Sequence, residues 1–123
     1  MLVEEFLERS AERFPDKTAL LCDGKRLAYR EVEERSNRLA HALISEGLKR
    51  GDRAAIYLDN TVEAALAIFA VLKAGAVFLP VNPTTKADKL AYILNNCRAT
   101  FLLTEVKRLE GISECWEIGR AHV

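Results

Sequence analysis

Apolar and polar residues alternate with a helical period at the start of the chain. Val3, Phe6, Leu7, Ser10 and Phe14 fall at i, i+3, i+4, i+7 and i+11, while charged residues fill the opposite face. This spacing predicts a helix with one apolar face, ended by the proline at position 15 because the residue before a proline is excluded from the α region.

A hairpin and a longer helix are predicted next. The short apolar segment 18–22 and its expected partner strand 25–28 flank an Asp-Gly pair at 23–24, which is typical of a tight turn because glycine accepts a positive φ. An inward face of Val32, Ser36, Leu39, Ala40 and Leu43 indicates a helix over 29–46, and the glycine at 47 suits its left-handed end.

The remainder of the chain reads as strand, helix, strand, helix, strand. Strands are expected at 54–58, 76–79 and 100–104, because each is short and apolar with little alternation. The helix at 62–74 is apolar almost all round and is expected to be buried. The next helix is expected after Thr85, with its apolar stripe at Ala87, Leu90, Ala91 and Leu94. The predicted fold is α/β: a helix, a hairpin and a helix, followed by a parallel βαβαβ unit with helices on both faces of the sheet.

Composition narrows the class of protein. The 123 residues are 50% hydrophobic, which suffices for one core, and 18 basic residues balance 18 acidic ones, so no nucleic-acid partner is expected. No apolar run is long enough for a transmembrane segment, and the acidic N-terminus does not resemble a signal peptide. The cysteines at positions 22, 97 and 115 form neither a disulfide framework nor a zinc pattern, so the predicted location is cytoplasmic.

Candidate chemical groups all have structural interpretations. His41 has no metal-ligating residues at suitable spacing, so a packing or surface role is predicted. Asp59, Asn60 and Glu63 match a helix capping box, with Asn60 as the cap, better than an acid cluster. The cell-adhesion-like Arg50-Gly51-Asp52 is interpreted as a turn, Cys97 as a small buried side chain at a helix end, and Cys22 as a residue of an apolar strand. Thr85 is interpreted as a helix cap, with Asp88 at the third helical position.

Glycine-rich motifs that cradle phosphates are absent from the sequence, as is the Gly-x-Ser-x-Gly motif of hydrolases. The residues alone therefore predict an α/β domain with no catalytic, cofactor-binding or metal-binding residue.

Several segments resemble a known family. The most specific is residues 67–83, Ala-Ile-Phe-Ala-Val-Leu-Lys-Ala-Gly-Ala-Val-Phe-Leu-Pro-Val-Asn-Pro, and residues 27–32, 37–40, 51–58 and 84–97 support it. Together they resemble the N-terminal part of AMP-forming acyl-CoA synthetases, the adenylate-forming superfamily that also includes luciferases and peptide-synthetase adenylation domains. The resemblance covers about residues 1–104.

The resemblance implies a reaction for the full-length family member. A carboxylic acid reacts with ATP, assisted by Mg, to give an acyl-adenylate and pyrophosphate, and coenzyme A then displaces AMP. The family's phosphate-binding loop and catalytic lysine have no counterpart here. The chain is therefore expected to be an inactive scaffold fragment whose partners are the missing remainder of the synthetase and, in full length, the carboxylic acid substrate.

Two segments depart from the family pattern. Ala28 stands where the family usually has Thr or Ser, which would complete a capping box with Glu31. Residues 117–123, Glu-Ile-Gly-Arg-Ala-His-Val, equal the translation of the start of a common sequencing adapter. The expected division is therefore a partial N-terminal subdomain at 1–116 and a non-native tail at 117–123 that makes no family-like packing and is poorly ordered or arbitrarily placed.

Alternatives remain open at the level of function. The Asn82-Pro83-Thr84-Thr85-Lys86-Ala87-Asp88 segment favours a fatty or other acyl substrate, and hence fatty acid metabolism, over an amino acid. The other possibilities are an amino-acid adenylation domain fragment, a stand-alone α/β binding or regulatory module of the receiver type, and a degenerate partner of a larger ligase. A phosphate-loop motif in the continuing reading frame would identify a synthetase.

Overall fold

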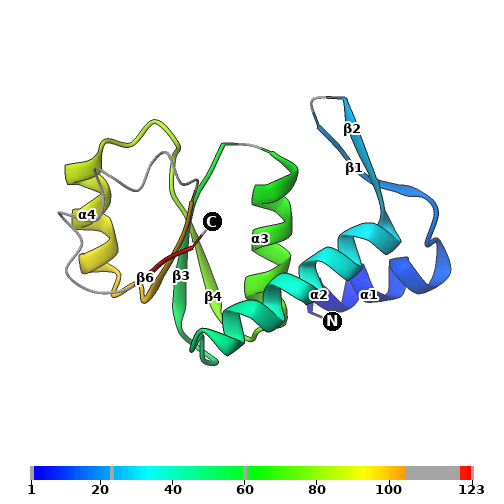
Figure 1. Ribbon diagram of the computed structural model, residues 1–123, viewed down its shortest axis with the longest axis horizontal. Coiled ribbons are helices and arrows are strands. Elements are labelled where there is room, and N and C mark those ends of the chain that lie inside the picture. The colour runs from blue at the N-terminus through cyan, green and yellow to red at the C-terminus, as the bar shows by residue number, and fades with distance from the viewer. Residues whose placement is uncertain (1, 23, 60, 105–119, 123) are drawn as a thin grey trace.

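The computed structural model describes residues 2–22, 24–59, 61–104 and 120–122 (Figure 1). The elements along the chain are α1 (Val3–Arg13), β1 (Thr18–Cys22), β2 (Lys25–Ala28), α2 (Tyr29–Ser45), β3 (Arg53–Tyr57), α3 (Val62–Lys73), β4 (Val77–Pro80), α4 (Ala87–Asn96), β5 (Phe101–Thr104) and β6 (Arg120–His122). Every predicted helix and strand is present, with ends shifted by one or two residues.

A parallel sheet with the strand order β4-β3-β5-β6 forms the centre of the fold. Ala54 of β3 lies opposite Phe78 of β4 on one side and opposite Phe101 of β5 on the other, and both pairings are parallel. The predicted parallel pairing of the three strands is therefore confirmed.

Both faces of this sheet are covered, because successive side chains of β3 point in opposite directions. Ala54 and Ile56 belong to a core shared with α2 and α3, whereas Ala55 and Tyr57 belong to a core shared with α4. Figure 1 shows α4 on one side of the sheet and α2 and α3 on the other. This burial on both faces explains why the strand sequences are apolar with little alternation of polar residues.

The hairpin packs against the helices and not against the sheet. β1 and β2 pair antiparallel around the predicted turn, with Cys22 opposite Lys25. Leu27 of β2 joins Leu7, Val32, Val62 and Leu66 in a third apolar cluster that connects α1, α2 and α3. The hairpin and α1 are thus fixed to the sheet indirectly, through α2 and α3.

Only part of the predicted apolar face of α1 packs against the rest of the fold. Only Leu7 is buried, while Val3 and Phe6 are 60% exposed and Phe14 is 42% exposed. The helix is rotated so that Leu7 faces the third cluster and Glu8 reaches Lys73 of α3. That rotation turns the remaining apolar side chains of the stripe outward.

Two predicted helix caps are also wrong in position. The N-cap of α3 is Thr61, whose Oγ1 accepts a hydrogen bond from the Ala64 N–H at 3.3 Å, and Asn60 lies outside the described residues. α4 begins one residue later than predicted, after Lys86 and without a side-chain cap. The Thr85 carbonyl instead accepts a hydrogen bond from the Tyr57 hydroxyl at 2.5 Å, so a contact between distant residues overrides the local capping preference.

Part of the C-terminal segment pairs with the sheet. The backbone of Arg120–His122 forms the parallel strand β6 beside β5, with Arg120 opposite Phe101. The physical reason for this pairing is that the β5 edge offers unpaired backbone groups to any extended segment that reaches it. The expectation of a non-native tail without family-like packing stays a prediction for these three residues. Residues 105–119 and 123 lie outside the described part of the chain, so the expectation for residues 117–119 and 123 stays a prediction.

Candidate functional site

A cavity of ≈ 240 Å³ lies at the carboxyl end of the sheet. Its lining comes from the ends of β3 and β5, from α2 and from the first half of α3. The lining residues are Leu39, Leu58, Thr61, Glu63, Leu66, Ala67, Leu103 and Thr104. Open parallel sheets bind their ligands outside the carboxyl ends of the strands, so this is the position where the fold favours a site. The cavity is smaller than the roughly 300–1,000 Å³ of typical small-molecule pockets.

The two threonine hydroxyls that line this cavity form hydrogen bonds with backbone groups. Thr104 Oγ1 donates to the Tyr57 carbonyl at 2.7 Å, and this bond is buried. Thr61 Oγ1 donates to the Asp59 carbonyl at 3.2 Å and also caps α3. Among the residues that the structure describes, no histidine or carboxylate is hydrogen-bonded to either hydroxyl in a way that could activate it as a nucleophile.

The charge of the lining also limits its chemistry. Glu63 is the ionisable residue among the described lining residues, and no Lys or Arg accompanies it. A site for phosphoryl groups requires cations or a nest of backbone N–H groups. The cavity can therefore accept an apolar group, but its described lining residues do not include the cations that would bind a phosphoryl group.

The candidate residues of the sequence lie apart from one another. His41 is exposed on α2, and no group of three metal-ligating side chains occurs within the described residues. Arg50-Gly51-Asp52 forms the predicted turn, in which Asp52 Oδ2 accepts the Lys49 N–H at 2.8 Å. Cys97 was expected to be buried, but it is only half-buried at the end of α4. Cys22 is half-buried in β1, and Cys115 lies outside the described residues.

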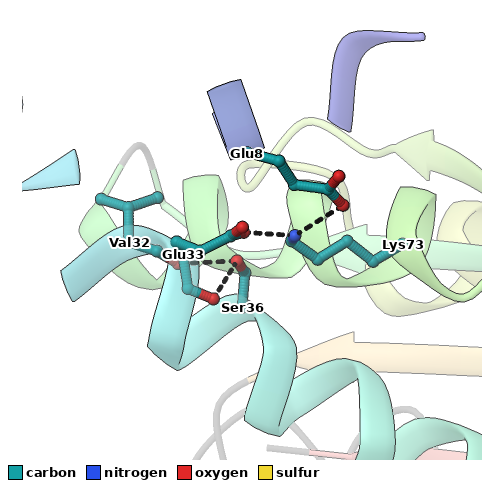
Figure 2. A network of polar contacts seen from close by, with 5 residues as sticks. All are labelled: Glu8, Val32, Glu33, Ser36 and Lys73. Carbon is teal, nitrogen blue, oxygen red and sulfur yellow. Dashed lines mark hydrogen bonds and ion pairs between the residues drawn. The ribbon is translucent and has the colours of Figure 1, made fainter. Parts of the chain in front are cut away.

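Sequence reasoning missed an ion-pair network around Lys73, which we call the Lys73 network (Figure 2). The Lys73 side chain, on the last turn of α3, is only 6% exposed. Its Nζ pairs with the Glu33 carboxylate of α2 and lies 3.5 Å from Oε1 of Glu8 on α1. Beside Glu33, the buried Ser36 hydroxyl donates to the Val32 carbonyl at 2.6 Å.

The Lys73 network joins three helices that are distant in the sequence. The one signal that could have revealed it is the single lysine at the end of a largely buried helix whose other residues, Glu63 excepted, are apolar, since a buried cation requires a partner. Its two ion pairs link α3 to α1 and to α2.

Among the residues that the structure covers, none of the helices combines the length and the apolar character needed to cross a membrane.

Comparison with known proteins identifies the family. The sequence model described as "AMP-binding enzyme" matches residues 7–122, which is nearly the whole chain. The chain belongs to the AMP-binding enzyme family. This membership confirms the resemblance to adenylate-forming enzymes, and it removes the interpretation as a receiver-type regulatory module.

The similar proteins in the AMP-binding enzyme family include both peptide synthetases and CoA ligases. The chain is 48% identical over 99 residues to the phosphinothricin tripeptide synthetase PhsC of Streptomyces viridochromogenes, covering 80% of this chain and 9% of PhsC. It is 34% identical over 103 residues to a medium/long-chain-fatty-acid–CoA/3-oxocholest-4-en-26-oate–CoA ligase of Mycobacterium marinum, covering 84% of this chain and 19% of the ligase.

Solved structures agree with this assignment. An artificially fused adenylation–PCP di-domain of a nonribosomal peptide synthetase, NpsA-ThdA from Klebsiella oxytoca, superposes with a TM-score of 0.84 at 29% identity. The match covers 96% of this chain and 22% of that one. The chain thus spans less than a quarter of the length of each of these three proteins.

Proposed function

We propose that the chain is the N-terminal scaffold portion of an amino-acid adenylation domain in a peptide synthetase. The observation that carries this proposal is the identity of 48% to a tripeptide synthetase, against 34% to a CoA ligase over a similar length. In such a domain a carboxylate attacks the α-phosphorus of ATP, pyrophosphate leaves, and an aminoacyl-adenylate forms. ATP and Mg would be held by residues beyond this chain.

The part played by this chain would be mechanical. The sheet, with α2 and α3 behind it, presents the apolar cavity at its carboxyl edge as one wall of a site that other segments complete. The Lys73 network would hold the helices in register while those segments bind and release their ligands. We expect no catalytic residue within this chain, and we expect the isolated chain to be inactive.

A second candidate is the scaffold of an ATP-dependent carboxylate–CoA ligase acting on a fatty acid. It is favoured by the identity to the Mycobacterium marinum ligase, and coenzyme A would then be a further substrate. The spacing of the cysteines supports a reducing, cytoplasmic location for either candidate.

The decisive experiment uses the uninterrupted reading frame that contains this chain. The purified product is assayed for exchange of labelled pyrophosphate into ATP, with amino acids and fatty acids tested separately. We expect exchange that depends on an amino acid and none with the 123-residue chain alone. Exchange that depends only on a fatty acid, with formation of a CoA thioester, would establish the second candidate instead.

A further inference from the structure

We draw no further inference here: the strongest candidate, the outward apolar face of α1 around Phe6 and Phe14, carries acidic side chains as well as basic ones, and nothing in the structure shows what covers it.

Discussion

Replacing Lys73 by methionine tests whether the Lys73 network stabilises the fold. Methionine keeps most of the apolar stem, so the change removes mainly the charge. Glu33, whose side chain is 20% exposed, would then lack its partner. Removing one member of a buried ion pair costs about 3–5 kcal/mol, whereas exposed pairs contribute about 0.2–1 kcal/mol.

The partial exposure of Glu33 sets the expected size of the effect between these limits. Water can reach its carboxylate but not freely, so Lys73→Met should lower the free energy of unfolding by about 2–3 kcal/mol. For a chain of this length that corresponds to a fall in Tm of roughly 6–10 °C. Urea and thermal unfolding followed by circular dichroism measure both quantities.

A double-mutant cycle separates the ion pair from packing. Combining Lys73→Met with Glu33→Leu removes both charges, and the double variant should recover about 1–2 kcal/mol relative to the sum of the single changes, because an apolar replacement of a buried pair is often nearly neutral. Glu8→Gln is the control, since its side chain is 50% exposed and its loss should cost no more than about 1 kcal/mol. Additive single effects, or an equal cost for Glu8→Gln and Lys73→Met, would refute the structural role assigned to the pair.

Three further substitutions test the stability of the fold, and the encoding DNA tests the origin of the C-terminal tail. Ala28→Thr should raise the free energy of unfolding by about 1 kcal/mol, because Glu31 already accepts the Ala28 N–H at 3.2 Å and only the hydroxyl half of the capping box is missing; no gain in urea unfolding would contradict this. Gly75→Ala should be destabilising by at least about 1 kcal/mol, since φ is +77° and a Cβ would lie 3.3 Å from Cγ of Arg50. Leu102→Ala should cost about 2–5 kcal/mol in the same assay, because its side chain is fully buried between β3 and α4. The encoding DNA should match the adapter over codons 117–123, and a different sequence would restore this segment as native protein.

The order of elements and the parallel pairing followed from the sequence because they depend on local patterns. Short apolar strands, a helix apolar all round and glycines at helix ends each specify one element, and βαβ connections leave little choice of topology. The hairpin was predictable for the same reason, since its Asp-Gly turn lies within the segment it shapes.

Contacts between distant residues account for the errors. The stripe of Val3, Phe6 and Phe14 has the correct period for a helix, but the rotation of that helix depends on Leu7 and on Glu8 meeting Lys73 far along the chain. Thr85 has the residue type of a cap, yet its carbonyl is fixed by the Tyr57 hydroxyl. The cavity at the carboxyl edge was not predictable either, because its lining comes from four separate segments.

The position of β3 between β4 and β5 has a consequence for biosynthesis. The strand that is made first lies in the middle of the sheet, and its two faces are covered at different times. Once residue 80 has left the ribosome, α2 and α3 can cover one face, but Ala55 and Tyr57 remain uncovered until α4 and β5 follow. At about 5–20 residues per second this interval lasts roughly one to five seconds. During this window the nascent chain exposes an apolar sheet face and an unpaired strand edge, and it is then that a chaperone would be needed most.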